Sequence, residues 1–312
     1  MGVIKEVIRF FRPNPLDVML EKMQRNDKHS LLLVWNRGLG DIALGLYAMV
    51  VRIREYVPNA NITFVTRADL KDGIQLLDGV EVIVGHQCMR GQPIDLEAVL
   101  DAYGKSREDY DLVIENPDPT YWVKWQLGSL VPKLRWCDQW DAYADDFSLD
   151  KDTVYMGVHV DTETGHYYGY EKNWPYKYWY ELFKRMTEEK GVKIILFGFN
   201  QETKFELDGI IDLRGKTQLL EALSIIKNYL TYFVVPDSGL LSIAYYLNVS
   251  FPLKAISLWA DPRQGILKQN VPSPNVDLIH VPLIGRDEYV GNISVEQVMQ
   301  TLATMYADEP IT

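Results

Sequence analysis

Short apolar runs alternate with stretches of helical periodicity from residue 31 onward. The runs LLLVW, NITFV, VEVIV and YDLVIE are separated by helical patterns at residues 41–56, 69–77 and 94–107. This rhythm predicts βαβ units, and runs that are apolar on both faces suit the buried strands of a parallel sheet. Right-handed crossovers then carry the carboxyl ends of the strands, and the loops that follow them, to one rim. Functional residues are therefore expected on those loops.

The same rhythm restarts after a polar, acidic stretch at residues 138–152, so we predict a linker between two domains near residue 150. The strands expected there are VYMGVHV, VKIILFG, TYFVV, KAISLW and VDLIHV, with helices at residues 177–189, 216–229, 238–247 and 294–306. A chain of 312 residues is longer than one core usually supports. We therefore predict an α/β fold of two Rossmann-like domains facing across a cleft, at residues 31–150 and 151–312, after an N-terminal extension at residues 1–30. We expect that the closing helix, residues 294–306, can pack back on the first domain.

The composition limits the classes of function. A net charge of −11 and a pI near 5.0 oppose tight sequence-independent binding to nucleic acid, which draws its affinity from Lys and Arg. No stretch approaches the roughly 18 apolar residues of a membrane span, and the opening MGVIKEVIRFFRP lacks the apolar core of a secretory signal. A cytoplasmic location is therefore expected. Cys88 and Cys137 lie far apart and outside any metal-ligand spacing, so both are expected to be reduced thiols.

Residues 1–12 have the pattern of a short amphipathic helix. Apolar residues recur there at helical spacing, with basic residues between them: Ile4, Val7, Ile8 and Phe11, with Lys5, Arg9 and Arg12. Such a helix can touch an anionic membrane surface, here the inner membrane face. The alternative is that its apolar stripe packs on the protein itself.

After the first strand, NRGLGDIALGLYAM forms a glycine-containing turn that opens a helix. Gly38 and Gly40 permit close backbone approach, and Asp41 falls at the helix N-terminus, where its carboxylate would face the cleft as a candidate base. Asp is also a favoured N-cap, so a purely structural role is the alternative. The turn lacks the Gly-Lys-Ser/Thr ending of a Walker A loop and the full GxGxxG fingerprint. Nucleotide hydrolysis and dinucleotide binding are therefore disfavoured in this domain.

The first strand of the second domain delivers a set of polar side chains to the rim. These are His159, Asp161, Thr162 and Thr164. The next segment, HYYGYEKNWPYKYW, carries Lys172, which can neutralise a diphosphate as a point charge where leaving-group charge develops. An ordinary solvated lysine is the alternative. Trp174-Pro175 before a helix also fits a hydrophobic staple and an N1 proline.

The strand TYFVV ends in a third motif, Pro236-Asp237-Ser238-Gly239, directly before a helix. Free backbone N–H groups and the helix dipole favour an anion at such a terminus, and Gly239 lets a phosphate approach. Asp237 can instead simply cap the helix. Upstream, IIDLRGKTQLL suggests a short strand and a basic turn, whose Arg214 and Lys216 either line the same pocket or are solvated.

The run DLRGKTQLLEALSIIKNYLTYFVVPDSGLLSIAYYLNV resembles the nucleotide-binding core of the ADP-heptose:lipopolysaccharide heptosyltransferases, glycosyltransferase family nine. Gly40-Asp41 and Lys172-Asn173-Trp174-Pro175 match two further motifs of that family, and Asp261-Pro262 falls at its short Asp-Pro after a strand. The resemblance covers roughly residues 31–306, with the motifs in order. It implies the GT-B architecture, although periplasmic binding proteins and some epimerases share this outline.

The resemblance implies an inverting, metal-independent transfer of a sugar from a nucleotide-diphosphate donor, with an ADP-sugar favoured and no cofactor. Asp41 takes the position of the family's base, and Lys172 that of its phosphate-contacting lysine. Residues 31–150 would bind the acceptor and residues 151–312 the nucleotide sugar. The expected donor-binding residues are Gly40, Thr162, Thr164, Glu202, Lys216, Asp237, Ser238, Gly239 and Leu240. For Glu202, a surface glutamate is the alternative.

The residue types suit this chemistry independently of the resemblance. Inversion needs one carboxylate to take the proton of the acceptor hydroxyl and a second group to stabilise the departing diphosphate. Hydrolysis by paired carboxylates would need two acids flanking the bond, and no such pair stands out. Asp109-Tyr110-Asp111 has a metal-binding form but precedes its strand, at the wrong end of the sheet, and Asp161 with Glu163 lacks a supporting His. We therefore expect no metal.

The sequence departs from the family at two places. Leu240 to Ile243 contains no His, which the family commonly has after the Asp-Ser-Gly turn, so the donor contact made there differs. After the fourth strand the chain reads Glu115-Asn116-Pro117-Asp118 in place of Asp-Leu-Gln-Gly, so acceptor recognition should differ too. The expected acceptor-binding residues are Asn116, Asp118, Tyr121 and Trp122. Aromatic faces here, and at Tyr167 to Tyr170, can stack on a sugar ring or a base, with core packing as the alternative.

Two other classes of protein fit the same outline. One is a sugar-nucleotide epimerase or a non-catalytic nucleotide-sugar-binding protein of the GT-B fold. The other keeps glycosyl transfer but uses a nucleic-acid or protein acceptor, which the net acidity opposes for nucleic acid. The partners expected on the leading interpretation are a nucleotide sugar and a glycan or glycolipid acceptor.

Overall fold

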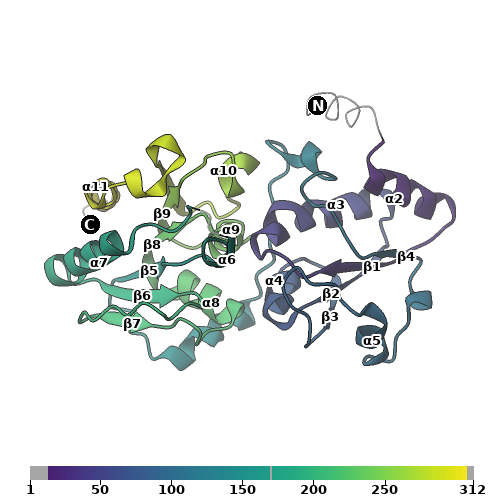
Figure 1. The fold of residues 1–312 in the computed structure, drawn as a ribbon, viewed down its shortest axis with the longest axis horizontal. Coiled ribbons are helices and arrows are strands. Elements are labelled where there is room, and N and C mark those ends of the chain that lie inside the picture. Colours follow the sequence, from purple (N-terminus) through teal and green to yellow (C-terminus); the bar gives the residue numbers. More distant parts are fainter. Residues whose placement is uncertain (1–12, 169–170, 308–312) are drawn as a thin grey trace. The chain divides into compact units, whose positions relative to one another are not determined.

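The computed structural model describes residues 13–168 and 171–307 and divides into two compact units, Met1–Gln126 and Leu127–Thr312 (Figure 1). Residues 1–12, the predicted amphipathic segment, lie outside the described residues. Each unit contains one parallel sheet with helices, which confirms the predicted α/β class. No helix within the described residues is long and apolar enough to cross a membrane.

The first unit is built on a four-stranded parallel sheet with the order β3-β2-β1-β4. The strands are β1 (Ser30–Trp35), β2 (Asn61–Thr66), β3 (Val80–Val84) and β4 (Leu112–Ile114). β1 is central and buried from Leu31 to Trp35, as a strand covered on both faces must be. The strand order reverses between β1 and β4. The loops after these two strands therefore open at the switch point, where α/β sheets bind ligands.

Helices surround this sheet. They are α2 (Pro15–Arg25), α3 (Tyr47–Tyr56), α4 (Lys71–Gln75) and α5 (Leu96–Asp101), and a π-helical turn (Ile42–Leu46) precedes α3. The Asn14 side chain accepts a hydrogen bond from the backbone N–H of Leu16 at 3.0 Å and so caps α2. Leu16 and Leu20 of α2 are fully buried. Residues from Asn14 onward therefore belong to the core of the first unit and not to a separate extension.

The second unit contains a six-stranded parallel sheet with the order β10-β9-β8-β5-β6-β7. Its strands are β5 (Tyr155–His159), β6 (Lys193–Phe197), β7 (Ile210–Asp212), β8 (Leu230–Pro236), β9 (Leu253–Trp259) and β10 (Leu278–Ile284). Counted from β5 along the chain, this is the strand order of the doubly wound nucleotide-binding fold. Its switch point lies between β5 and β8, so the loops after these two strands define the expected ligand site.

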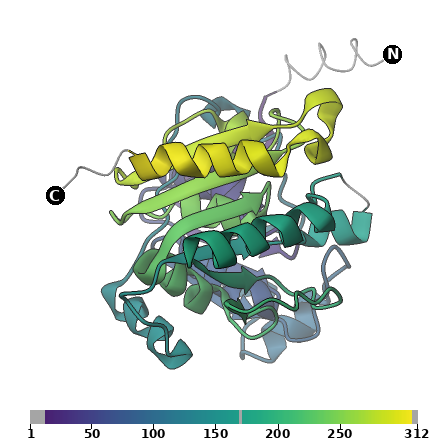
Figure 2. The same ribbon diagram turned by 90° about the vertical axis from the view of Figure 1, so that its left-hand side faces the viewer.

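Six α-helices accompany this second sheet in the described residues. They are α6 (Glu163–Tyr168), α7 (Tyr176–Lys184), α8 (Leu219–Tyr229), α9 (Gly239–Tyr245), α10 (Gly265–Gln269) and α11 (Val295–Ala307). Figure 2 shows α7 and α11 running across the same face of the sheet. Trp179 and Phe183 of α7 and Leu302 of α11 pack there with side chains of β5, β6, β8 and β9. The closing helix, α11, is thus part of the core of the second unit.

The division between the units lies at Gln126 and Leu127, ahead of the linker predicted near residue 150. The polar stretch that suggested a linker forms a 3-10 helical run, Asp138–Phe147, which packs on α8. The Ser224 hydroxyl donates to the Asp141 carbonyl at 2.8 Å, and Lys227 lies 2.9 Å from the Asp141 carboxylate. These contacts place the stretch inside the second unit.

Candidate active site

The predicted functional residues lie on loops that follow the strands at the two switch points. In the first unit, Asp41 follows β1 and the predicted acceptor residues follow β4. In the second unit, Thr162 follows β5 and Asp237 follows β8. The sequence-based placement of these residues at the carboxyl ends of their strands is therefore confirmed. Their chemical roles stay predictions.

Asp41 directly precedes the π-helical turn Ile42–Leu46, and its side chain makes no capping hydrogen bond to that turn. A Cβ atom on Gly38 would lie 2.6 Å from Asp41 Oδ2, so only glycine leaves room for this carboxylate position. The Trp35 indole N–H donates to the Gly38 carbonyl at 3.1 Å and fixes the loop, and Gly40 lies half-buried beside Asp41. Asp41 itself has helical backbone angles and follows Gly40, where the helix begins, so it is not the N-cap residue.

Lys172 forms an ion pair with Asp237, with 2.5 Å between Nζ and Oδ2. The two side chains are 25% and 10% exposed, so the pair is largely withdrawn from solvent. The lysine comes from the segment between β5 and β6 and the aspartate directly follows β8, so the pair joins the two sides of the switch point. Lys172 is therefore not the ordinary solvated lysine that the sequence left as an alternative.

The turn after Asp237 has two roles in the local structure. The Ser238 hydroxyl accepts a hydrogen bond from the Leu241 N–H at 3.2 Å and caps α9, which begins at Gly239, while the Leu240 side chain is buried. Asp237 itself is therefore free of the capping role that was its alternative. A Cβ atom on Gly265 would lie 2.5 Å from Asp237 Oδ1, so α10 also begins against this carboxylate.

Thr162 is buried and engaged within the protein. Its N–H donates to Asn173 Oδ1 at 2.8 Å, its hydroxyl donates to the same oxygen at 3.1 Å, and the hydroxyl accepts from the Gly165 N–H at 2.9 Å. Thr162 therefore ties the loop after β5 to the segment that carries Lys172. Thr164 lies half-buried in α6. The side chains of residues 167–170, predicted as an aromatic platform, lie outside the described residues.

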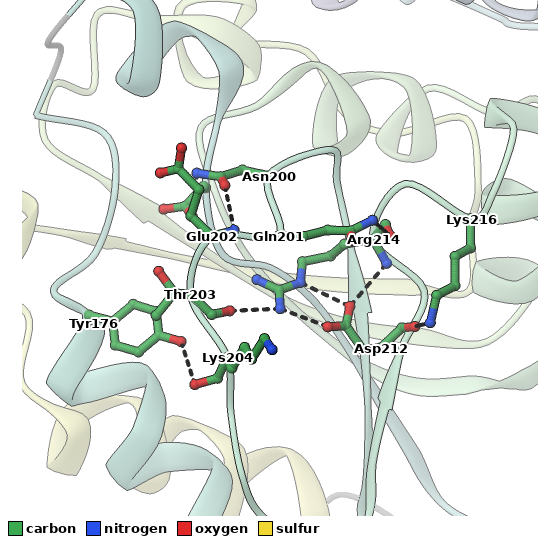
Figure 3. Close-up of polar contacts among 10 residues, drawn as sticks. Tyr176, Asn200, Gln201, Glu202, Thr203, Lys204, Asp212, Arg214 and Lys216 are labelled. Carbon is green, nitrogen blue, oxygen red and sulfur yellow. Dashed lines mark hydrogen bonds and ion pairs between the residues drawn. The ribbon is translucent and has the colours of Figure 1, made fainter.

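Arg214 clamps the loops that follow β6 and β7 (Figure 3). It is 2% exposed and pairs with Asp212 through Nε–Oδ1 and Nη2–Oδ2 contacts of 2.9 and 2.7 Å. Its Nη2 also donates to the Thr203 carbonyl at 2.7 Å. The hydrogen bonds from Arg214 lower the pKa of the Asp212 carboxyl. Arg214 is thus not solvated, and its contacts to Asp212 and Thr203 hold the two loops together as a clamp.

Glu202 and Lys216, two predicted donor-binding residues, lie on these clamped loops and are exposed (Figure 3). The Glu202 N–H donates to Asn200 Oδ1 at 2.9 Å, and Lys216 Nζ donates to the Asp212 carbonyl at 2.7 Å. The Asn200 amide reaches Asp161 Oδ2 at 3.4 Å and so links this loop to the one after β5. The exposure of Glu202 and Lys216 fits either a donor contact or a plain surface position.

An aromatic pair fastens α7 to the loop that carries Glu202. The Tyr176 ring stacks on Phe205 at 4.5 Å between centroids, and its hydroxyl donates to the Lys204 carbonyl at 3.4 Å. Burial raises the pKa of Tyr176 to about 12, which keeps this hydroxyl protonated at neutral pH.

The predicted acceptor residues form a compact turn after β4. These are Asn116, Asp118, Tyr121 and Trp122. Asp118 Oδ1 accepts from the N–H groups of Thr120 and Tyr121 at 3.2 and 3.0 Å, which makes the turn rigid. The Trp122 carbonyl accepts from the Asn14 side chain at 2.5 Å. Tyr121 is 48% exposed with Lys124 Nζ 4.6 Å from its ring centroid, and Asn116 is also exposed, so both are accessible to a ligand.

The Asp109-Tyr110-Asp111 motif lies at the amino-terminal end of the sheet, as the sequence predicts. Asp111 Oδ2 accepts from the N–H groups of His29 and Ser30 at the start of β1, at 2.9 and 3.0 Å, far from the carboxyl rim. Backbone hydrogen bonding by Ser30 and the Lys28 ammonium lower the pKa of Asp111 to about 2. Within residues 13–168 and 171–307, no three His, Cys, Asp or Glu side chains gather in a way that could hold a metal ion.

Two buried polar residues of the first unit were not predicted from the sequence. Arg67 directly follows β2 at the same rim and is 6% exposed, with its Nε 3.0 Å from Asp69. Gln126 is 2% exposed and bonds to the turn after Asp41. Arg67 could have been found, because a cation immediately after a predicted strand falls at the carboxyl rim. Gln126 has no comparable local signal.

Comparison with known proteins bears on both units. Residues 128–265 match the family model of glycosyltransferase family 9 (heptosyltransferase). The chain is similar to the E. coli ADP-heptose lps heptosyltransferase II at 18% identity and a TM-score of 0.62, covering 90% of this chain and 99% of that one. It is similar to the family 9 glycosyl transferase from Veillonella parvula DSM 2008 at 17% identity and a TM-score of 0.61, covering 90% and 98%.

A third structure is more distant. The iron-containing dodecameric glycosyltransferase TibC from enterotoxigenic E. coli H10407 shares 11% identity at a TM-score of 0.54, covering 91% of this chain and 77% of that one. No curated protein matches the sequence.

These similarities define the class: the chain has the two-domain α/β fold of the GT-B glycosyltransferases. Over residues 128–265 it is similar to glycosyltransferase family 9, the heptosyltransferase family that the sequence motifs resemble.

Proposed function

We propose that this protein is an inverting, metal-independent glycosyltransferase. It moves a sugar from a nucleotide-diphosphate donor, with an ADP-sugar first among the candidates, to a hydroxyl of a glycan or glycolipid acceptor. The first unit binds the acceptor and the second unit binds the nucleotide sugar. Contact of residues 1–12 with the inner membrane face belongs to the same proposal, because it would bring the enzyme to a glycolipid acceptor.

One observation carries this proposal most directly. Within the region that matches family 9, the Lys172 ammonium is held 2.5 Å from Asp237 at the switch point between β5 and β8. This is where doubly wound sheets bind the phosphates of nucleotides. A cation in that place can stabilise the charge that develops on a departing diphosphate.

Asp41 supplies the second chemical requirement. The acceptor hydroxyl gives its proton to the Asp41 carboxylate as its oxygen attacks the anomeric carbon from the face opposite the diphosphate. The bond from the anomeric carbon to the diphosphate breaks, and the nucleoside diphosphate leaves with the bonding electron pair. Attack from the opposite face inverts the configuration. The position of Asp41 on the loop that follows β1, at the switch point of the first sheet, supports this role.

Thermal stabilisation by a panel of ADP-, UDP-, GDP- and CMP-sugars tests donor binding. A true donor binds the folded state and raises the melting temperature, by an amount that grows with its concentration relative to Kd. Nucleotide release from the same panel, with a glycan or glycolipid acceptor present, then tests turnover, in the presence of EDTA for metal independence and with NMR of the anomeric proton of the product for inversion.

Asp41→Asn separates catalysis from binding. This variant should lose at least about 100-fold in turnover, since a general base contributes about 10²- to 10⁴-fold, and should keep its response to the donor. Stabilisation without turnover in the wild type would indicate a nucleotide-sugar-binding protein. No response to any sugar in the panel would refute the proposal as a whole.

A further inference from the structure

The helix that begins at Gly40 and carries Asp41 in its first turn contains a π-helical turn, Ile42–Leu46. Its signature is the hydrogen bond from the Tyr47 N–H to the Ile42 carbonyl, five residues back. Such a turn holds one residue more than an α-helical turn, and each residue of an α-helix turns the chain by about 100°. The direction in which Asp41 points relative to α3 therefore depends on this turn being kept.

Gln126 provides a donor to the turn from a distant part of the first unit. Its side chain is 2% exposed, and Nε2 donates to the Leu44 carbonyl at 2.5 Å. A π-helical turn interrupts the regular ladder of backbone hydrogen bonds, so a side-chain donor at one of its carbonyls stabilises it against reversion to α-helix. Gln126 lies 82 residues from Leu44 in the chain, so only the fold brings the two together.

The same turn is fitted closely against the segment that ends in Gln126. A Cβ atom on Gly45 would lie 2.5 Å from Pro119 Cβ and 2.7 Å from its carbonyl oxygen. Pro119 stands within the predicted acceptor turn, next to Asp118. The residues from Pro119 to Gln126 thus contact the turn at two places, once by packing and once by a hydrogen bond.

We propose that Gln126 is a positioning residue for Asp41: its amide holds the π-helical turn and thereby aims the Asp41 carboxylate. This inference rests on the proposed function, because Asp41 must be the base for its direction to matter. Only a donor can make the bond to the Leu44 carbonyl. A methionine of similar length fills the space without donating, and a glutamate carboxylate places an acceptor against an acceptor.

Turnover of Gln126→Met and Gln126→Glu tests the inference, measured as nucleotide release from the panel of ADP-, UDP-, GDP- and CMP-sugars. A misplaced catalytic group costs about 100-fold for about 1 Å, so kcat should fall about 10- to 100-fold. The dissociation constant of the donor should change little, because all the predicted donor-binding residues except Gly40 lie in the other unit. Gln24→Met, the same substitution at an exposed glutamine of α2, should leave both constants unchanged.

A double variant decides whether Gln126 acts through Asp41. In an Asp41→Asn background, adding Gln126→Met should lower kcat no further, because there is no base left to aim. If Gln126→Met lowers kcat by the same factor in the Asp41→Asn background as in the wild type, the inference is overturned. A wild-type kcat in both single Gln126 variants would also overturn it. If Gln126→Met does not fold, the isosteric Gln126→Glu gives the same comparison. If the Asp41→Asn variant keeps wild-type turnover, in contrast, the proposed mechanism itself is refuted, and this inference with it.

Discussion

Replacing Lys172 by methionine should remove the proposed anion-binding site while the protein still folds. The ammonium makes a short ion pair with Asp237, and we propose that it transfers part of that interaction to the donor diphosphate. A hydrogen bond to a charged group is worth about 1.5 to 3 kcal/mol. Because about 1.4 kcal/mol corresponds to a tenfold change, Lys172→Met should weaken ADP binding by about 10- to 150-fold. Isothermal titration calorimetry with ADP measures this directly.

The same variant should also lower stability, and that effect can be distinguished. It leaves the Asp237 carboxylate, 10% exposed, without its cation, at a cost of about 1 to 2 kcal/mol once the partial exposure of the lysine is taken into account. Adding Asp237→Asn should restore most of the melting temperature but not the affinity for ADP. Lys190→Met, an exposed lysine of the same unit, controls for the change in net charge. Unchanged ADP affinity in Lys172→Met would refute the assignment of the anion site.

Three further changes probe other parts of the site. Gly38→Ala places a Cβ atom 2.6 Å from Asp41 Oδ2, so turnover should fall about 10- to 100-fold while the melting temperature stays within a few degrees of wild type. Burial lowers the pKa of His280 to about 4, so the stability it contributes is complete above pH 6.5 and is lost as the pH falls towards 4. Between pH 7 and pH 5 this amounts to about 2 kcal/mol, which His280→Gln should remove from denaturant unfolding curves and the exposed control His86→Gln should not. Arg214→Lys should loosen the loop that carries Glu202, a predicted donor residue. The rate of hydrogen exchange at residues 200–204 should therefore rise, and donor binding should weaken several-fold with little change in kcat. Unchanged exchange would show that the clamp is dispensable.

The strands and their loops could be predicted because their signals are local. LLLVW and TYFVV are apolar on both faces, and a parallel sheet is the structure that buries such runs. Once the strands were assigned, the residues directly after them had to lie at one rim, which is how Asp41 and Asp237 were found. Neither step requires knowledge of which segments pack together.

Pairings between distant segments could not be predicted in the same way. The ion pair of Lys172 and Asp237 joins residues 65 apart, and both residues had satisfactory local explanations as a solvated lysine and a helix cap. The segment Asp138–Phe147 looked like a linker because it is acidic, but Trp140 and Ala144 are buried when it packs on α8. In both cases the tertiary contact decides between local alternatives that sequence periodicity leaves equal.

The three site loops are fixed in the same way. Each is held by a polar side chain from elsewhere in its own unit: the turn after Asp41 by Gln126, the loop of Thr162 by Asn173, and the loop of Glu202 by Arg214. Loops at a carboxyl rim have few backbone partners, so side-chain donors and acceptors must fix their geometry. Each bond is worth only about 0.5 to 3 kcal/mol of stability, whereas displacement of a reacting group by about 1 Å costs about 100-fold in rate. Substitution of these three residues should therefore reduce binding or turnover at temperatures where the protein remains folded.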